Sequence, residues 1–432
     1  MMDDFDWPDL ARRFGTPAYV YDGDALARQI TGLREALHPD LEIFFSLKSN
    51  PNPAVYGILH AHGARAEVSS LAELTTVLAA GTAPRDILFL GPGKSERELA
   101  ACIDNGLYAI VCESFQELAD IDRLAAERDV RQRVMLRVNP AYSASGSRLT
   151  MGGKPRQFGI DEAAVLEAGD LVARHPNVDL AGIQAYLGTR ILDADVVVGN
   201  TTYILDLSER VSAALGIRLD VVDVGGGLGV PYFDGEEEFD LKALQAELNP
   251  LLDTFRAAHP GTRLIMESGR YLTADAGTYV VGVRYTKESM GERFAVTDGG
   301  THHHMAAVGI GSFVKRNFPI ELLAHGDGDG RGRGDSHGDS GGVAEPEAGT
   351  GRWTVTGPLC TPNDTIGKKV ALPALNPGDL LGVRRSGAYG PSASPVLFLS
   401  HGYPAEVLVT GGEARLIRER DTTDDLLAKY RP

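Results

Sequence analysis

Cysteine and basic residues are scarce in this sequence, and long apolar runs are missing. Only three of its 432 residues are cysteines, and they stand far apart at Cys102, Cys112 and Cys360. Because so few, separated cysteines do not make a disulfide framework, we expect reduced thiols and a cytoplasmic location. The acidic start, MMDDFDWPDLARRFG, lacks the apolar stretch of a signal peptide, and no run approaches the roughly 20 residues of a membrane helix. These absences disfavour a secreted or membrane protein.

The charge balance excludes a further class. Acidic residues outnumber basic ones by 59 to 42, so the net charge is -17 at pH 7 and a nucleic-acid backbone would be repelled. Nucleic-acid binding is therefore not expected. A hydrophobic share of 43% with 23% charged residues is typical of a globular chain with a sizeable core. At roughly 100–200 residues per domain, the length indicates two or three domains.

Short apolar runs alternate with helical patterns from residue 30 to 275. Such alternation predicts parallel strands joined by right-handed helical crossovers. Eight such units in about 250 residues predict a closed (β/α)8 TIM barrel. A doubly wound sheet is the alternative, but no GxGxxG motif opens a helix. The runs are IFFSLKSN, ARAEVSS, DILFLGPG, AIVCES, VMLRVNP, LAGIQAYLGT, DVVDVGGG and RLIMESG.

The pattern changes after residue 276. The text becomes strand-like and rich in turns, as in GTYVVGVRYTK, RFAVTDGG and RWTVTGPLC, which predicts an all-β domain over 276–432. Within residues 1–29 the segment PAYVYD also reads as a strand, and we expect it to join that domain. Residues 325–349 are rich in Gly, Asp and Ser and cannot bury apolar area, so a disordered surface loop is expected there.

Polar residues at the predicted carboxyl ends of the barrel strands indicate an active site. Lys48 closes the apolar run IFFSLKSN. Burial would lower the pKa of its amine and make it a nucleophile, although a lysine that reaches the surface is the plainer alternative. Glycines at other strand ends let backbone N–H groups approach a phosphate. They stand in Gly225-Gly226-Gly227, Gly188-Thr189 and Gly269-Arg270. A lysine and a phosphate site at one rim together indicate pyridoxal phosphate.

Five motifs, in this order along the chain, resemble those of the fold-type III pyridoxal-phosphate decarboxylases, the ornithine/diaminopimelate/arginine decarboxylase family. They are SLKSN, GGGLG, ESGR, GPLCTPND and GAYG. The resemblance covers nearly the whole chain and implies a TIM barrel with a β-domain, amino-acid decarboxylation, and a homodimer with shared active sites. Further segments, MGGKPRQFGIDE, MESGRYL and DGGTHHH, resemble a branch that decarboxylates glutamate tethered to an acyl carrier protein in antibiotic biosynthesis.

The resemblance also implies roles for single residues. Lys48 would hold the cofactor as a Schiff base, and Glu267 would keep its pyridine nitrogen protonated. Cys360 would enter from the partner subunit and protonate the carbanion left when CO2 departs. Glu67 and Arg137 match positions near the cofactor. The phosphate would be bound by Gly226, Gly227, Gly269, Arg270, Thr189 and Tyr389.

Two departures from the family pattern bear on cofactor and substrate. Tyr186 stands where the family usually has a histidine that stacks on the cofactor ring. Thr361 stands where an aspartate or glutamate usually reads the distal amine of the substrate. A distal ammonium would find no carboxylate there, so we expect a substrate whose far end is uncharged or conjugated. A free diamino acid such as diaminopimelate is the alternative.

Further positions are predicted to bear on substrate recognition. Asp364 and His302 are expected to contact the substrate, His302 as the first residue of a histidine run near the entrance. A metal site in that run would need further ligands, and none is identified. An acidic carrier protein would need a basic patch, for which Lys315 and Arg316 are candidates. An amino-acid racemase and an inactive binding homologue are the rival functions.

Overall fold

The computed structural model describes residues 5–142, 149–150, 155–308, 316–326 and 350–431. They belong to two compact units, one of residues 26–231 and 236–273 and the other of residues 1–25, 232–235 and 274–432. We call these the barrel unit and the β unit. The expected limits, 30–275 for one domain and 1–29 with 276–432 for the other, differ from these by a few residues. The sequence did not indicate that residues 232–235 return to the β unit.

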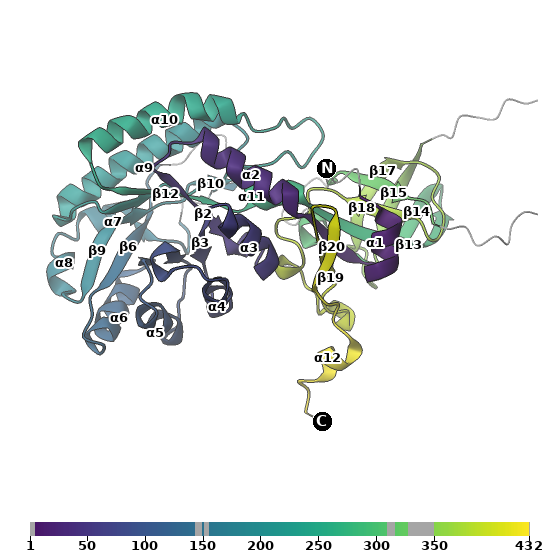
Figure 1. Cartoon of the computed structure of the whole chain (residues 1–432), viewed down its shortest axis with the longest axis horizontal. Coiled ribbons are helices and arrows are strands. Elements are labelled where there is room, and N and C mark those ends of the chain that lie inside the picture. Colours follow the sequence, from purple (N-terminus) through teal and green to yellow (C-terminus); the bar gives the residue numbers. More distant parts are fainter. Residues whose placement is uncertain (1–4, 143–148, 151–154, 309–315, 327–349, 432) are drawn as a thin grey trace, which may run out of the picture. The chain divides into compact units, whose positions relative to one another are not determined.

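The barrel unit contains a closed barrel of parallel strands, so the predicted (β/α)8 TIM barrel is confirmed (Figure 1). The strand order is β5-β4-β3-β2-β12-β11-β9-β6, and pairing of β5 with β6 closes the ring. Nearly all strand residues are buried, as expected for parallel strands with helices outside them. The strands are β2 (Leu41–Ser46), β3 (Arg65–Val68), β4 (Ile87–Phe89), β5 (Ala109–Cys112), β6 (Gln132–Asn139), β9 (Val178–Gln184), β11 (Val221–Asp223) and β12 (Arg263–Ser268).

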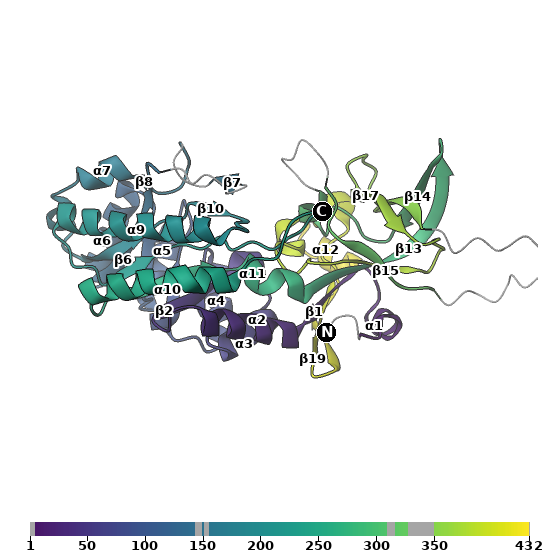
Figure 2. The same ribbon diagram turned by 90° about the horizontal axis from the view of Figure 1, so that it is seen from above.

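Serine caps set where three of the outer helices begin. The pattern Ser-x-x-Glu occurs at the start of α4, α5 and α6, and each serine side chain accepts a hydrogen bond from the glutamate N–H. The long helices α9 and α10 run side by side (Figure 2). The helices are α2 (Gly23–Ala36), α3 (Pro53–Ala61), α4 (Leu71–Ala79), α5 (Glu96–Asp104), α6 (Phe115–Ala126), α7 (Glu162–Leu166), α8 (Leu171–Arg174), α9 (Ala194–Leu215), α10 (Leu241–Ala258) and α11 (Arg270–Thr273).

Apolar side chains fill the interior of the barrel, so polar groups are left to the strand ends. Short strands β8 (Ile160–Asp161), β7 (Leu149–Thr150) and β10 (Gly188–Thr189) lie beyond the barrel strands. The packing resembles the side-chain layers that make a TIM barrel a core and not a pore. The apolar cluster inside the barrel consists of Phe44, Leu88, Leu90, Ala109, Val111, Met135, Ala181, Val221 and Ile265.

The β unit is a mixed sheet in the order β17-β16-β14-β13-β1-β19-β20, with β18 pairing β13 and β15. The N-terminal strand β1 pairs antiparallel with β13 and parallel with β19, as expected for PAYVYD. Trp7 and Leu10 of α1 pack in the same apolar cluster as Val280 and Val407 of the sheet. The elements are α1 (Trp7–Phe14), β1 (Ala18–Asp22), β13 (Gly277–Ser289), β14 (Glu292–Thr297), β15 (Ile320–Ala324), β16 (Gly351–Thr356), β17 (Thr365–Leu372), β18 (Leu380–Val383), β19 (Ala405–Thr410), β20 (Glu413–Arg418) and α12 (Thr423–Leu427).

Two further predictions concern the loop over residues 325–349 and membrane-spanning helices. Of the expected loop over 325–349, residues 327–349 lie outside the described residues. In the part of the chain that the structure describes, no helix is long and apolar enough to cross a membrane.

Candidate active site

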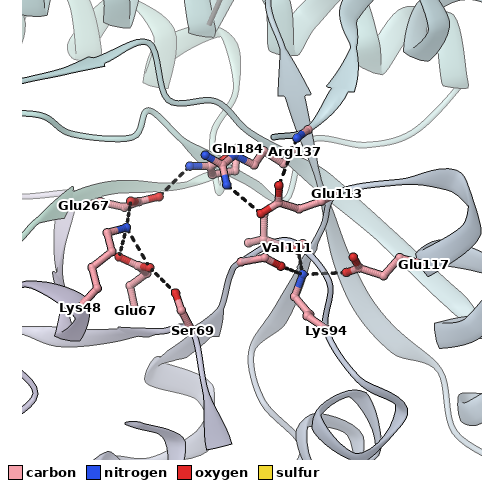
Figure 3. Close-up of polar contacts among 12 residues, drawn as sticks. Lys48, Glu67, Ser69, Lys94, Val111, Glu113, Glu117, Arg137, Gln184 and Glu267 are labelled. Carbon is pink, nitrogen blue, oxygen red and sulfur yellow. Dashed lines mark hydrogen bonds and ion pairs between the residues drawn. The ribbon is translucent and has the colours of Figure 1, made fainter. Parts of the chain in front are cut away.

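Lys48 lies just beyond β2, in a single 3-10 turn formed by Leu47–Ser49. Its ammonium is 3.1 Å from Oε2 and 3.3 Å from Oε1 of Glu67, and 3.8 Å from Oε2 of Glu267 (Figure 3). The lysine side chain is 42% exposed, whereas the two carboxylates are 1% and 2% exposed. The amine therefore meets buried negative charge on one side and remains accessible on the other, as an amine that receives a ligand must.

Glu67 is the nearer of these two carboxylates. It pairs in register with Ser46 at the end of β2, and this register places the carboxylate beside the turn that carries Lys48. Ser69 Oγ donates a hydrogen bond to Glu67 Oε1 at 3.3 Å. Glu67 is thus held from two sides, and it anchors the lysine amine.

Glu267 enters from β12 and is held by Gln184 of β9. Gln184 Nε2 donates to Glu267 Oε1 at 2.7 Å, and both side chains are buried. Burial, with the nearby Glu67 carboxylate, raises the pKa of Glu267, while Lys48 and Arg137 act in the opposite direction. A carboxylate in this setting gains strongly from a cationic N–H partner, which is what a protonated pyridine nitrogen offers.

Arg137 of β6 is matched by Glu113, which follows β5. Its Nη1 donates to Glu113 Oε1 at 2.7 Å, and the N–H of Gly159 donates to Oε2 at 3.1 Å. The guanidinium also lies over the ring of Phe158, 4.7 Å from its centre. Because Arg137 pairs in register with Gln184, this buried ion pair lies directly beside the group that holds Glu267 (Figure 3).

The turn after β11 requires glycine for two reasons. Gly225 and Gly227 have φ angles of +67° and +102°, in the region that side-chain-bearing residues rarely adopt. A Cβ on Gly226 would lie 1.8 Å from the backbone oxygen of Glu267, and one on Gly227 would lie 2.1 Å from that of Gly188. The glycine loop therefore packs directly against the backbone of Glu267 on one side and of Gly188 on the other.

Three more predicted cofactor residues surround this loop. Thr189 follows Gly188, whose backbone touches the loop, and Arg270 begins α11 directly after β12. A Cβ on Gly269 would lie 2.8 Å from Ser49 Oγ, so the turn before Arg270 packs against the turn that carries Lys48. The structure thus brings the lysine, both glycine turns and Arg270 to one end of the barrel.

Tyr186, the residue at the family's histidine position, lies on the same side. Its ring centre is 5.9 Å from Lys48 Nζ. A planar ring at this place can cover one face of a cofactor ring attached to that amine, but unlike a histidine it carries no positive charge.

The other predicted residues belong to the β unit. Cys360 is an exposed free thiol, and Thr361 beside it is partly buried. Tyr389 has a φ of +55°, a conformation that is uncommon for a residue with a side chain and is often retained at functional sites. Cys102 and Cys112, in contrast, lie buried in the barrel unit, where burial raises their pKa values to about 12 and leaves them unreactive.

Asp364 is hydrogen-bonded to backbone groups of its own unit, and the substrate contact expected for it stays a prediction. Its Oδ1 accepts the N–H of Thr301 and its Oδ2 accepts the N–H of Leu359, both at 2.7 Å. The side chain is buried. Because both oxygens accept hydrogen bonds from backbone groups of the same unit, this carboxylate stabilises the loop that carries Cys360.

The histidine run is buried in the β unit, and the substrate contact expected for His302 stays a prediction. His302 is 0% exposed and its ring centre lies 3.8 Å from that of His303 and 4.4 Å from that of His401. Burial lowers the pKa values of His303 and His304 to about 2 and 3, so these side chains are neutral core residues. Among the residues with described positions, no group of three or more His, Cys, Asp or Glu side chains is arranged to hold a metal ion.

Four buried polar residues of the barrel were missed by the sequence analysis. The side chain of Lys94, for example, is 1% exposed, and its ammonium donates to the carbonyl oxygens of Gly91 and Val111 and to Glu117. A usable signal was present for three of them, because Glu113, Gln184 and Asp223 end or directly follow an apolar strand, where a polar group must find a partner. Lys94 lies five residues beyond the end of β4. The four residues are Lys94 in FLGPGK, Glu113 in IVCE, Gln184 in GIQA and Asp223 in VVDV.

Comparison with known proteins agrees with this geometry. The pyridoxal binding domain of the pyridoxal-dependent decarboxylases matches residues 24–274. The chain is 39% identical over 420 residues to the L-glutamyl-(BtrI acyl-carrier protein) decarboxylase of Niallia circulans, a match that covers 97% of this chain and 94% of the relative. It is 32% identical over 426 residues to the diaminopimelate decarboxylase of Neisseria meningitidis serogroup B, covering 98% of this chain and 94% of the relative.

A solved structure gives the same result for the fold. Diaminopimelate decarboxylase from Helicobacter pylori, complexed with L-lysine, matches with a TM-score of 0.84 and 26% identity, and the match covers 98% of each chain. Each of these full-length matches includes the barrel and the β unit. The chain therefore belongs to the pyridoxal-dependent ornithine/diaminopimelate/arginine decarboxylase family, and it is a carboxy-lyase that uses pyridoxal phosphate.

Proposed function

We propose that this enzyme removes the α-carboxylate of an amino acid whose side chain is conjugated, such as a glutamyl group tethered to an acyl carrier protein. The relative with 39% identity is named for that substrate. The observation that carries the proposal is Thr361, the residue that follows Cys360 in the GPLCTPND motif.

The loop around Thr361 offers no carboxylate to a distal ammonium. Thr361 Oγ1 accepts the N–H of Asn363 at 3.3 Å. Asp364 is the one acidic residue of the loop 360–364, and both of its oxygens accept backbone N–H groups. An ammonium brought to this loop would lose water and find the Asp364 carboxylate buried and already bonded to two backbone N–H groups, at a cost of about 1–3 kcal/mol. A thioester-linked side chain carries no such charge.

The barrel unit fits pyridoxal phosphate by the chemistry of its donors. Lys48 offers an accessible amine, Glu267 a buried carboxylate for the ring nitrogen, and the loop Gly225–Gly227 with Arg270 offers N–H donors for a phosphate. When bound, pyridoxal phosphate supplies the electron sink that accepts the electron pair left behind as CO2 departs.

Each side chain then has a defined task. Lys48 holds the cofactor, and Glu67 fixes the lysine amine in place. Glu267 keeps the ring nitrogen protonated, and Tyr186 covers one face of the ring. Arg137 supports this end of the barrel. The phosphate is bound by Gly226, Gly227, Gly269, Arg270, Thr189 and Tyr389.

The remaining task belongs to Cys360. Its Sγ donates a proton to the α-carbon that has lost CO2, and it does so in the site of the partner subunit of a homodimer. The exposed thiol is free in the structure. A free thiol with this task is best preserved in a reducing compartment, which supports a cytoplasmic location.

A carrier protein also requires a place to dock. Arg316 is exposed, and its guanidinium carbon lies 4.4 Å from the ring centre of Phe233; Lys315 lies outside the described residues. A tethered substrate of this kind supports a role in the biosynthesis of antibiotics or similar secondary metabolites.

The test is CO2 release at one pH from free glutamate, ornithine, lysine, diaminopimelate and carrier-bound glutamate. We expect kcat/KM for the carrier-bound substrate to exceed that of every free amino acid by about tenfold or more. A carrier loaded with glutarate, which lacks the α-amine, is the control and should release no CO2. Diaminopimelate as the best substrate would establish the alternative, a diaminopimelate decarboxylase.

A further inference from the structure

Three buried polar side chains stand next to one another on strands β9, β11 and β12. Gln184 ends β9 and pairs in register with Asp223, which ends β11, and both residues are 0% exposed. Gln184 Nε2 donates to Glu267 Oε1 at 2.7 Å. The backbone also links the group, because the N–H of Glu267 donates to the carbonyl oxygen of Gly225 at 2.7 Å.

Two acceptors in this group are left without a donor. Asp223 Oδ1 accepts the N–H of Gly225 at 2.9 Å. Asp223 Oδ2 and Gln184 Oε1 are both buried, and neither has a hydrogen-bond partner among the described residues. Buried acceptors without donors are rare because each has lost its water. Two acceptors cannot satisfy each other, but one added proton would turn one of them into a donor.

The register allows these two acceptors to meet. Neighbouring strands of a sheet lie about 4.8 Å apart, so in-register side chains on one face are within reach of a hydrogen bond. A proton on Asp223 Oδ2 would therefore satisfy that oxygen and Gln184 Oε1 in a single step.

The charges around Asp223 favour the same protonation state. Among the described residues, the charged groups that act most strongly on Asp223 are Glu267, Glu67 and Lys48. If Asp223 is ionised, three negative carboxylates (Asp223, Glu267 and Glu67) surround the one ammonium of Lys48. If Asp223 is neutral, only two negative carboxylates surround it. Burial and the Glu267 carboxylate raise the pKa of Asp223 well above its ordinary value. Arg137 also acts on the Glu267 carboxylate, and its guanidinium is paired with Glu113 at 2.7 Å.

We propose that Asp223 is a positioning residue that carries a proton on Oδ2 and donates it to Gln184 Oε1. This hydrogen bond fixes the orientation of the Gln184 amide. The amide then presents Nε2, and not Oε1, to Glu267, because a flipped amide would face the carboxylate with a second acceptor. The inference rests on the proposed role of Glu267 at the ring nitrogen, which requires that carboxylate to stay ionised and correctly oriented.

The proton itself is tested by infrared spectroscopy of the full-length protein loaded with pyridoxal phosphate and labelled with carbon-13 at the aspartate carboxyl. We expect a protonated-carboxyl band at pH 8 that shifts with the label and is lost in Asp223→Asn. Asp298, a buried aspartate of the β unit whose pKa is also raised, is present in both proteins and cancels in the difference. Identical spectra for the wild type and Asp223→Asn would overturn the proposal, whatever substrate the enzyme uses.

The positioning role is tested by comparing two variants. Asp223→Asn retains a donor for Gln184 Oε1 and an acceptor for the N–H of Gly225, so the bound cofactor should keep its absorbance and its pH dependence. Asp223→Ala removes both groups. We expect it to shift the pH at which that absorbance changes and to lower kcat by about tenfold or more. If Asp223→Asn behaves like Asp223→Ala, or Asp223→Ala like the wild type, Asp223 does not orient Gln184.

Discussion

Lys48 and Glu67 form an ion pair with an N–O separation of 3.1 Å, and Glu67 is 1% exposed. Removing the lysine charge would leave that carboxylate buried beside Ser69 without the cation that pairs with it, which is costly. The position of the amine is thus set by its charge, while its reaction with an aldehyde depends on its being a primary amine. Substitution can separate these two properties.

The first prediction uses that separation. Lys48→Arg keeps a cation beside Glu67 and should fold with nearly wild-type stability, but it has no primary amine to hold the cofactor. After reduction with borohydride and unfolding, the wild type should retain the cofactor on the peptide that contains Lys48, as measured by mass spectrometry. Lys48→Arg and Lys48→Ala should retain none and should not release CO2. Covalent cofactor on Lys48→Arg would mean that another residue holds it.

The second prediction concerns the glycine loop. Gly226→Ala would place a Cβ 1.8 Å from the backbone oxygen of Glu267, so the loop or the end of β12 must move. We expect the Kd for pyridoxal phosphate to rise by about tenfold or more, measured by fluorescence titration. Gly57→Ala is the matched control. Gly57 lies inside α3 with nothing within 4 Å of the added Cβ, so alanine should stabilise the chain by about 0.4–1 kcal/mol. Equal cofactor binding by both variants would contradict the assignment of this loop.

The third prediction follows from the buried histidines of the β unit. His304 Nε2 lies 2.8 Å from Ser386 Oγ, and burial lowers the pKa of His304 from 6.5 to about 3. Below pH 6.5 the unfolded chain takes up a proton that the folded chain does not. Proton uptake by the unfolded chain therefore lowers the free energy of unfolding as the pH falls from 6.5 toward about 3. Above pH 6.5, His304 is neutral in both states and this loss of stability is absent. This one histidine should raise the unfolding equilibrium constant by roughly tenfold per pH unit between about pH 6 and pH 4.

The measurement is urea unfolding of wild type and His304→Gln across this pH range. The variant is expected to be less stable at every pH, but its stability should change with pH by one proton less than that of the wild type. His62→Gln, the same substitution at an exposed histidine of the barrel unit, is the matched control for the exchange of histidine for glutamine. A slope for His304→Gln equal to that of the wild type would show that His304 titrates normally in the folded protein.

The sequence predicts which residues stand at the strand ends, but it does not predict which side chains contact them. Lys48 and the three glycines at 225–227 were found because a charged residue or a glycine cluster that ends an apolar run is a local signal. The partners of such residues depend on strand register, which brings Gln184 beside Asp223 and Ser46 beside Glu67 although each pair is distant in sequence. Single-sequence patterns carry no information about that register.

The same limit applies to two β-unit residues whose expected substrate contacts stay predictions. The motifs DGGTHHH and GPLCTPND predict substrate contacts for His302 and Asp364, but they carry no information about what packs around these residues. In the folded unit, the ring of His302 lies next to the rings of His303 and His401. The two carboxylate oxygens of Asp364 accept hydrogen bonds from two backbone N–H groups. A motif identifies a segment, but burial decides which of its side chains remain available.

The fourth prediction tests shared active sites. If Cys360 acts in the site formed by its partner's barrel unit, inactive Lys48→Ala and inactive Cys360→Ala chains should complement each other. Random mixing should restore about a quarter of full activity, because half of the dimers are mixed and each has one intact site. The control mixes Lys48→Ala with a chain that carries both substitutions, which leaves no intact site. No recovery after demonstrated subunit exchange would place Cys360 in the site of its own chain.

The fifth prediction concerns specificity and rests on Thr361. Thr361→Asp introduces a carboxylate beside Cys360, whereas Thr361→Asn has the same size and shape without the charge. A carboxylate at this position should pair with the distal ammonium of a diamino acid and thereby recover about 1–3 kcal/mol of binding. Each 1.4 kcal/mol is a factor of ten, so kcat/KM for diaminopimelate should rise by roughly ten- to a hundredfold in Thr361→Asp.

The measurement compares both variants with the wild type on diaminopimelate and on carrier-bound glutamate at one pH. Thr361→Asn should gain little on diaminopimelate, because a neutral amide offers an acceptor without charge. Carrier-bound glutamate should become a poorer substrate for Thr361→Asp, because the new carboxylate loses water without gaining an ammonium partner. The gain on diaminopimelate should also weaken in high salt, because the added interaction is between charges. Equal effects of the aspartate and asparagine substitutions would mean that shape, and not charge, excludes diamino acids at this loop.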